Sequence, residues 1–490
     1  MSYPGMRDLK LKEDVLFERS RVGREGYSLP VEELKKASSI LPKELLRTEL
    51  DLPEISEVDV ARHFTRLSTY NFSIDHGFYP LGSCTMKFNP KINEKMARIP
   101  SFANLHPETP IEYSQGTLKM MYEMQQMLSE IGGFATTTLN PSAGAHGEYV
   151  GLGMIRNYFK KKGDTKRKKI IIPDSAHGTN PASCTLNDFD VVVLESNSEG
   201  KVCLTRLKEI LNDEVAGIML TNPNTLGVFE SDIVEITKAV HDAGGLVYGD
   251  GANMNALLGV ARPGDMGIDV LHYNLHKTFS TPHGGGGPGS GPVGACEKLV
   301  EFLPTPHVIL KDGKYCFAEA ENSMGMVRSF YGNMAVTLRA YVYILEMGRN
   351  YIPEIAKNAV LNANYIKACL KDTYHLKYKS DTLHEVVFDD TGMANNITTM
   401  DIAKALIDRG YHPPTVYFPL IVPGAIMIEP TETESKETLD SFIGAMIDIF
   451  EVAKTDPESI LKAPLNTAIS RPDEAVAARK PILKYTPETD

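Results

Sequence analysis

Between about residue 114 and residue 300, the apolar residues follow a strand-like and a helix-like pattern in turn. The strand-like runs are apolar at almost every position rather than at alternate positions, which is typical of strands buried on both faces. The segments between them have helical periodicity. This alternation predicts right-handed crossovers and a mainly parallel sheet, hence an α/β fold. The runs are KKIIIP, DVVVLE, AGIMLTNP, GGLVYGD and DVLHYNL.

Two segments give clear helix predictions. Residues 114–133, SQGTLKMMYEMQQMLSEIGG, place leucine and methionine on one face and end in two glycines, which are typical of a helix C-terminus. In residues 230–245, ESDIVEITKAVHDAGG, Asp232 can cap the helix and Glu235 follows three residues later, as in a capping box.

The two ends of the chain have different patterns. Residues 1–110 carry many loop signals and are predicted to form an arm or cap. From about residue 326 a long apolar helix, VRSFYGNMAVTLRAYVYILEMG, precedes a strand, helix, strand order and a last helix, KETLDSFIGAMIDIFEVA. The sequence therefore predicts a large domain over 111–325, a small α+β domain over 326–465 and a polar tail over 466–490.

Composition and charge narrow the class of protein. The chain has 490 residues, too many for one simple core, with 42% hydrophobic and 23% charged residues, which is ordinary for a globular protein. The net charge of −12 argues against nucleic acid as a partner. One basic cluster, Lys160 to Lys169, is interpreted as a solvated helix end rather than a docking patch.

Nothing in the sequence indicates a membrane span or a metal site. No segment approaches the roughly 20 apolar residues that a spanning helix requires, and the charged N-terminus is unlike a targeting peptide. The six cysteines are scattered, without C-x-x-C or metal-ligand spacing. We therefore expect no metal and a reduced, cytoplasmic protein.

Two ionisable residues end neighbouring predicted strands. Asp250 lies in LVYGDGAN, and Lys277 follows 27 residues later in YNLHKTF. In parallel sheets the ligand crevice lies beyond the carboxyl ends of the strands, and a buried charge there needs a partner. Two interpretations fit: a structural ion pair, or a pair flanking pyridoxal phosphate, which requires a lysine amine and a carboxylate against its ring nitrogen.

Other strand ends also carry polar groups. The turn LNPSAGAHG leads into a predicted helix and is either an ordinary connection or a phosphate site built from turn amides. His177 follows the first strand and either serves the structure or stacks on a flat ring. Asn224 follows the third strand together with Asn222 and Thr225. Polar groups at four successive strand ends favour a binding crevice.

Two motifs are set aside as decoys. GGGGPG at Gly284 to Gly289 matches a dinucleotide fingerprint only because a glycine run matches any glycine pattern, and no helix opens there. His272 and His276 are four apart but fall on a predicted strand, so they are not expected to converge on a metal.

Several stretches resemble the P-protein family of the glycine cleavage system, glycine decarboxylase, within the fold-type I pyridoxal phosphate enzymes. They cover most of the chain from about residue 65 onward. Single-chain members join two related halves, and this chain resembles only the half that keeps the lysine. The stretches are YPLGSCTMKFNP, PSAGAHGEYVGL, SAHGTNPAS, GDGANMNALLG, HYNLHKTFSTPHGGGGPGSGPVG and PLIVPGAIMIEPTETES.

The resemblance implies roles for individual residues. Lys277 is similar to the Schiff-base lysine, and Asp250 to the partner of the pyridine nitrogen. His177 resembles the ring-stacking histidine, while Asn253 or Asn224 is expected to reach the ring hydroxyl. The expected phosphate contacts are Ala145, His146 and Gly147, with His276 beside the lysine.

The resemblance also implies a reaction and partners. Glycine is expected to lose carbon dioxide on pyridoxal 5'-phosphate, and its aminomethyl group is expected to pass to the lipoyl arm of the H-protein. A companion subunit 1 in an α2β2 assembly is implied. Arg328 is a candidate for the substrate carboxylate on position alone, and the glycines after Gly284 are either a flexible connection or a path for the lipoyl arm.

Alternative functions remain open at this point. The chain could be another fold-type I enzyme, such as a cysteine desulfurase or a different amino-acid decarboxylase, or a scaffold subunit without catalysis. The stretches YPLGSCTMK and EPTETES argue against the other enzymes. The presence of both Lys277 and Asp250 argues against a scaffold.

Overall fold

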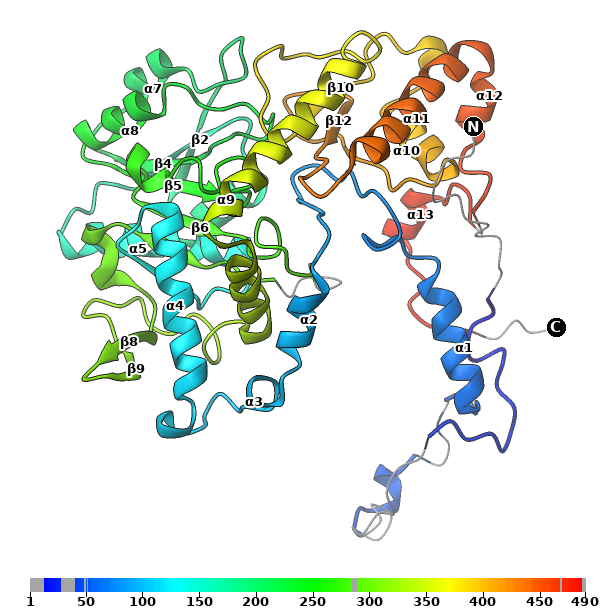
Figure 1. Cartoon of the computed structure of the whole chain (residues 1–490), viewed down its shortest axis with the longest axis horizontal. Helices are drawn as coiled ribbons and strands as arrows, with labels where there is room; N and C mark the ends of the chain where they lie inside the picture. The colour runs from blue at the N-terminus through cyan, green and yellow to red at the C-terminus, as the bar shows by residue number, and fades with distance from the viewer. Residues whose placement is uncertain are drawn as a thin grey trace.

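The chain forms a large α/β unit, a smaller α+β unit and an N-terminal segment that runs between and beyond them (Figure 1). Helix α1 (Glu57–Ser68) extends away from the two units, and a short helix, α13 (Glu474–Arg479), lies in the C-terminal tail. The computed structural model describes residues 13–27, 40–47, 50, 52–283, 289–467 and 469–486.

The large unit is built on a seven-stranded sheet with the order β1-β7-β6-β5-β4-β2-β3. Neighbouring strands from β3 to β6 are parallel, and β7 is antiparallel to both of its neighbours. The five predicted strands are confirmed, whereas β1 and β7 were not predicted because three residues carry no readable pattern. The strands are β1 (Thr136–Thr138), β2 (Lys169–Pro173), β3 (Asp190–Leu194), β4 (Val215–Thr221), β5 (Leu246–Gly251), β6 (Val270–Tyr273) and β7 (Val293–Ala295).

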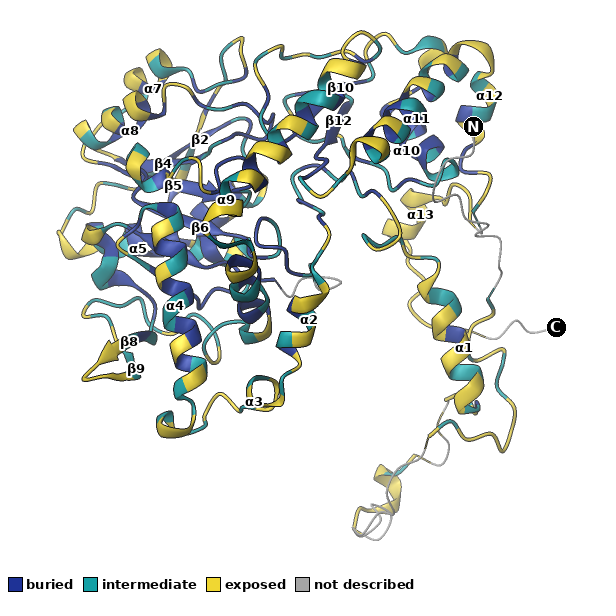
Figure 2. Cartoon of the chain, viewed as in Figure 1, coloured by how far each residue is buried: buried dark blue, intermediate teal, exposed yellow. Residues whose placement is uncertain are grey.

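Helices cover both faces of this sheet, and its central strands are buried (Figure 2). Ile171 of β2 packs into the core that contains α4 (Gln115–Gly132), and Ile170 packs into the opposite core, which contains α5 (Gly144–Lys161). Burial on both faces accounts for the continuous apolar runs of β2, β4, β5 and β6. For β3 the expected burial is wrong, because this strand lies at the edge of the sheet and its Val193 is 63% exposed. The remaining helices of this unit are α6 (Thr179–Leu186), α7 (Leu204–Ile210) and α8 (Ile233–Asp242).

The predicted helix ends are partly confirmed. Helix α4 ends at Gly133, whose φ of 76° is the left-handed conformation that glycine adopts readily. Asp232 stands at the start of α8, but its side chain makes no capping hydrogen bond. The predicted capping box is therefore wrong, because the φ of −92° and ψ of 21° at Asp232 are not the extended conformation that an N-cap requires.

The smaller unit has its own core around a three-stranded antiparallel sheet, β10-β12-β11. The long helix α9 (Met334–Leu370) is interrupted at Gly348, where φ is 59°. Tyr343 of α9 packs in the large core, whereas Ile366 packs in the small core. Helix α9 therefore contributes to both cores, and the boundary expected near residue 326 stays a prediction. The other elements of the smaller unit are β10 (Val386–Asp389), β11 (Thr415–Val416), β12 (Ala425–Ile428), α10 (Thr399–Asp408), α11 (Lys436–Thr455) and α12 (Pro457–Lys462).

Part of the N-terminal segment is built into the fold. Helices α2 (Lys91–Ala97) and α3 (Pro100–Ala103) lie beside the large unit (Figure 1). Just before them, Leu81 pairs with Ile428 at the end of β12, and the Gly82 carbonyl accepts a hydrogen bond from Thr415. The segment therefore joins the two units rather than only capping them.

Two further features complete the fold. An unpredicted hairpin, β8 (His307–Lys311) and β9 (Lys314–Ala318), follows the large sheet. The basic cluster is paired with surface carboxylates, as in Lys166 with Asp213, which fits a solvated helix end. Among the residues that the structure describes, no helix combines the length and apolar character needed to cross a membrane.

A glycine in the first turn of α5 sets the distance between this helix and the sheet. A Cβ at Gly147 would lie 2.7 Å from the Cβ of His272, so we expect Gly147→Ala to lower the free energy of unfolding by about 1–3 kcal/mol through overpacking. Gly116, in the first turn of the equally long α4, faces open space. Gly116→Ala is the matched control and should be neutral or slightly stabilising in urea unfolding. Equal stability of the two variants would contradict this packing role.

Candidate active site

A cavity of about 180 Å³ opens at the carboxyl ends of the parallel strands. Register places Thr221, Asp250 and His272 side by side on β4, β5 and β6. Residues from the N-terminal segment and the smaller unit, Ser83 and Glu385 among them, close the cavity from the other side. Of the expected site residues, those that line it are Lys277, Asp250, His177, Asn253, Asn224 and Ala145.

Lys277 lies in a turn rather than on the strand itself. It is four residues beyond Tyr273, the last residue of β6, and its backbone N–H donates to the Asn274 carbonyl at 3.0 Å. Its side chain is half-buried. Within the described part of the chain, no salt bridge or hydrogen bond is found for the Lys277 amine, so this amine faces the cavity without a bound partner.

Asp250 is buried, and side chains from two other elements contact its carboxyl group. Its Oδ2 accepts a hydrogen bond from Asn180 at 3.0 Å, and its Oδ1 lies 3.5 Å from His272 Nε2. Burial alone would raise the pKa of Asp250, but His272, the Asn180 hydrogen bond and the Lys277 charge together hold that pKa below its usual value. Asp250 therefore stays ionised without a direct ion pair to Lys277, and the ion-pair interpretation does not describe this site.

Several polar atoms in the cavity wall have no partner among the described residues. They are buried, they make no hydrogen bond within the described part of the chain, and they belong to side chains that line one space: Thr221 Oγ1, Asn274 Oδ1 and His272 Nε2, the last of which lies near Asp250 without a hydrogen bond to it. Buried polar groups are nearly always hydrogen-bonded in folded proteins. The wall is thus suited to a polar ligand.

His177 stands at the open side of the cavity. It is exposed, and its Nδ1 lies 2.9 Å from the hydroxyl of Thr179, which in turn donates to Glu148. The ring makes an edge contact with Phe418, with the centroids 5.6 Å apart. This arrangement orients the imidazole plane at the cavity mouth.

The two expected asparagines line the cavity, but their amide groups hydrogen-bond to other parts of the protein. Asn224 donates to the Gly200 carbonyl at 2.8 Å and to Glu230 at 2.9 Å. Asn253 donates to Glu429 at 2.8 Å and accepts from the Asn255 N–H at 2.9 Å. The Asn224 amide makes its full set of internal hydrogen bonds, whereas the Asn253 amide keeps one donor and one acceptor position unused among the described residues.

The expected phosphate contacts are only partly brought together. Gly144 and Ala145 line the cavity at the start of α5, where a helix leaves amide donors unpaired. The Gly147 N–H donates to the Ala143 carbonyl at 2.9 Å, and His146 Nδ1 accepts from the Ser142 N–H at 3.2 Å. Neither His146 nor Gly147 is among the lining residues.

His276 and Arg328 also lie away from the cavity wall. Burial, followed by His283 and Lys277, lowers the pKa of His276 to about 3, so its ring is neutral. Its Nδ1 accepts from the Ser290 N–H at 3.4 Å. Arg328 donates to Ser142 at 2.8 Å and to Asn333 at 2.9 Å. Gly284 to Pro288 lie outside the described residues, and with them most of the glycine run.

Sequence reasoning missed a group of buried acidic residues in the opposite wall. Glu385 and Glu429 come from the smaller unit, and Ser83 and Thr85 of the N-terminal segment donate to them. The stretches YPLGSCTMK and EPTETES contain three of these four residues. These stretches carried the resemblance, but no spacing rule linked positions more than 300 residues apart.

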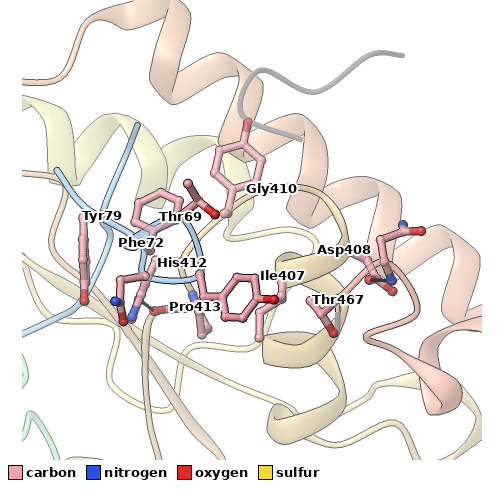
Figure 3. A pocket seen from close by; sticks show the side chains of 13 residues that line it. Thr69, Phe72, Tyr79, Ile407, Asp408, Gly410, His412, Pro413 and Thr467 are labelled. Carbon is pink, nitrogen blue, oxygen red and sulfur yellow. Dashed lines mark hydrogen bonds between the residues drawn. The ribbon is translucent and has the colours of Figure 1, made fainter. Parts of the chain in front are cut away.

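A second hollow, of about 440 Å³, is larger but lies elsewhere (Figure 3). Phe72, Tyr79 and His412 border it, together with the end of α10 at Asp408 and Thr467 of the C-terminal tail. No lysine lines it, and none of its lining residues comes from the strands of the large sheet or the turns that follow them. We therefore assign the candidate active site to the smaller cavity around Lys277.

The sheet order and the placement of Lys277 and Asp250 define the fold as that of the fold-type I pyridoxal phosphate enzymes. Solved structures with this fold resemble the chain. A P-protein of the glycine cleavage system in inhibitor-bound form has a TM-score of 0.70 at 21% identity, over 84% of this chain and 94% of that one. A cysteine desulfurase of Escherichia coli has a TM-score of 0.61 at 14% identity, over 77% and 96%.

The chain belongs to the glycine cleavage system P-protein family. The family model described as glycine cleavage system P-protein matches residues 28–311, and the model described as glycine dehydrogenase, C-terminal domain, matches residues 355–467. A probable glycine dehydrogenase (decarboxylating) subunit 2 of Caldanaerobacter subterraneus is 56% identical over 98% of this chain and 100% of its own length. The corresponding protein of Listeria innocua is 53% identical over 97% of this chain and 98% of its own length.

Asn180 gives a direct test of how Asp250 is stabilised. Asn180→Ala removes the donor to a buried carboxylate, so we expect it to lower the free energy of unfolding by about 1–3 kcal/mol. A carboxyl group whose pKa is lowered by folding contributes its full stability above the unfolded pKa and loses it as the pH falls through the folded pKa. The loss should therefore be constant from about pH 6 to about pH 8 in urea unfolding. An unchanged midpoint would contradict the assignment.

Proposed function

We propose that this chain is the lysine-bearing subunit of a glycine dehydrogenase (decarboxylating). In this proposal it removes carbon dioxide from glycine and passes the aminomethyl group to the lipoyl arm of a carrier, the H-protein. The observation that carries the proposal is the convergence of Lys277 and Asp250 on one cavity in a chain that matches the P-protein family over most of its length.

The residues present fit pyridoxal 5'-phosphate as the cofactor. Lys277 offers an amine, Asp250 an ionised carboxylate, and the start of α5 at Gly144 and Ala145 a place for a phosphate. The unpaired atoms of Thr221 and Asn274 add hydrogen-bonding capacity to the same wall. When bound, this cofactor supplies an electron sink for the pair released as carbon dioxide leaves.

Each wall of the cavity has a defined task in this proposal. Lys277 would hold the cofactor through its amine, and Asp250 would keep a proton on the ring nitrogen because it remains ionised. His177 would cover one face of the ring. Ser83 and Glu385 would restrict the entry of water from the opposite side.

The proposed assembly and location follow from the family. The relatives' name, subunit 2, implies a companion subunit 1, and we propose an α2β2 assembly of the two. All six cysteines are free in the structure, which supports a reducing compartment such as the cytoplasm.

Lys277→Ala is expected to abolish covalent attachment of the cofactor. Wild-type protein reconstituted with pyridoxal phosphate should show a visible absorption band and become irreversibly labelled at Lys277 after borohydride reduction. The variant should show neither the band nor the label. Lys160→Ala, which changes an exposed lysine on α5, is the control and should keep both. A band that persists in Lys277→Ala would contradict the proposal.

The full reaction is expected to require partners. Exchange of labelled bicarbonate into glycine should depend on this chain, subunit 1 and a lipoylated carrier together. Omission of any one should reduce the rate to background, because the lipoyl disulfide is the acceptor of the aminomethyl group. Rapid exchange by this chain alone would contradict the two-subunit assembly.

A further inference from the structure

Two buried carboxyl groups lie next to each other in the cavity wall contributed by the smaller unit. Glu385 and Glu429 are 2% and 0% exposed, and one oxygen from each lies within 4.8 Å of the other and of a ring nitrogen of His384. Glu385 lines the same cavity as Lys277, whereas Glu429 is not among the lining residues and contacts one of them, Asn253. Two carboxylates this close in a buried setting do not both ionise at neutral pH.

Hydrogen-bond donors are distributed unequally over this pair. Glu429 accepts from the Thr85 N–H at 2.8 Å, the Thr85 hydroxyl at 2.7 Å and Asn253 at 2.8 Å. Glu385 accepts only from the Ser83 N–H, at 2.8 Å, among the described residues. Three donors stabilise a carboxylate far better than one, so Glu385 is the member of the pair whose hydrogen bonds favour ionisation less.

The backbone of the N-terminal segment is bent to deliver these donors. Ser83 and Thr85 have φ values of 61° and 51°, a left-handed conformation that is rare for residues other than glycine. Cys84 lies between them. Surrounding contacts hold such a conformation in place, and here they include the hydrogen bonds to the two glutamates and the pairing of Leu81 with Ile428.

The other groups around Glu385 do not neutralise the pair. His384 Nε2 lies 3.8 Å from Glu385, and burial lowers the pKa of His384, so this ring is uncharged. Burial also raises the pKa of the Cys84 thiol to about 11. For Glu385, burial and then Glu429 raise the pKa well above its usual value, against the opposing Ser83 N–H and Lys277 charge.

We propose that Glu385 is the proton donor of the transfer step, and this inference rests on the proposed function. The C–C bond of glycine breaks and carbon dioxide leaves. The released electron pair forms a C–S bond to the lipoyl disulfide, and the S–S bond breaks. The carbon is oxidised and the disulfide is reduced by two electrons, and the departing sulfur takes its proton from Glu385, which solvent then reprotonates.

Glu385→Gln tests this proposal in the complete complex with subunit 1 and a lipoylated carrier. We expect aminomethyl transfer in a single turnover to fall about 100-fold, the scale of a lost general acid, while the glycine-induced change in the cofactor spectrum keeps its midpoint. Glu434→Gln is the matched control. Glu434 is also a half-buried carboxyl group, and burial raises its pKa to about 7, but it lines a different hollow.

The pH profile separates proton donation from a structural role. With wild-type protein the transfer rate should fall as the pH rises through the pKa of Glu385, and this limb should vanish in Glu385→Gln. In Glu429→Gln the limb should move to lower pH, because the negative neighbour that raises the pKa of Glu385 is gone. If Glu385→Gln fails to bind the cofactor, the pH profile of Glu429→Gln still tests whether Glu385 donates the proton.

Two outcomes would overturn the inference while leaving the proposed function intact. The first is a transfer rate for Glu385→Gln within about threefold of the wild-type rate, which is much less than the loss expected for a general acid. The second is a pH profile for Glu429→Gln in which the transfer rate falls at the same pH as in the wild type. Failure of the proposed function is recognised separately, since wild-type protein would then catalyse no exchange with subunit 1 and the carrier present.

Discussion

Burial of charged groups at the carboxyl ends of β5 and β6 constrains every segment that surrounds them. Each buried charge needs partners, and distant parts of the chain supply them. Lys87 of the N-terminal segment is buried and donates to Asn255, to the Thr278 carbonyl and to Glu432, at 2.9, 2.9 and 2.7 Å. One ammonium group thus joins the N-terminal segment, the large unit and the smaller unit. Removing one partner of such a pair is strongly destabilising.

The same constraint distributes charge around the cavity. On the side of the sheet, Asp250 remains an anion because Asn180, His272 and the Lys277 charge outweigh its burial. On the opposite side, Glu429 accepts two hydrogen bonds from Thr85, whereas Glu385 accepts one from Ser83, and burial raises the pKa of Glu385. The two walls of the cavity therefore shift the pKa of a carboxyl group in opposite directions. The carboxyl groups of Asp250 and Glu385 thus acquire different acidities from their neighbours.

The strand pattern predicted much of this arrangement. Continuous apolar runs identified five strands, and the rule for parallel sheets directed attention to the residues that follow them, which led to Asp250, Lys277 and His177. The same rule led to Asn224, and the family resemblance led to Asn253 and Gly147. Neither indicated the internal contacts of these residues: Asn224 donates to the Gly200 carbonyl, Asn253 donates to Glu429, and Gly147 packs closely against His272. Such contacts depend on neighbours that are distant in sequence.

By itself, the sequence determined the alternation of strands and helices, the side of the sheet that carries chemistry, and the family. These follow from local periodicity and from motifs read along the chain. Only the tertiary structure decided that Ser83 and Thr85 meet Glu385 and Glu429, across 302 and 344 positions. The protonation of a buried carboxyl group depends on the donors and charges within a few ångströms. Those neighbours are set by the packing of the three segments against one another.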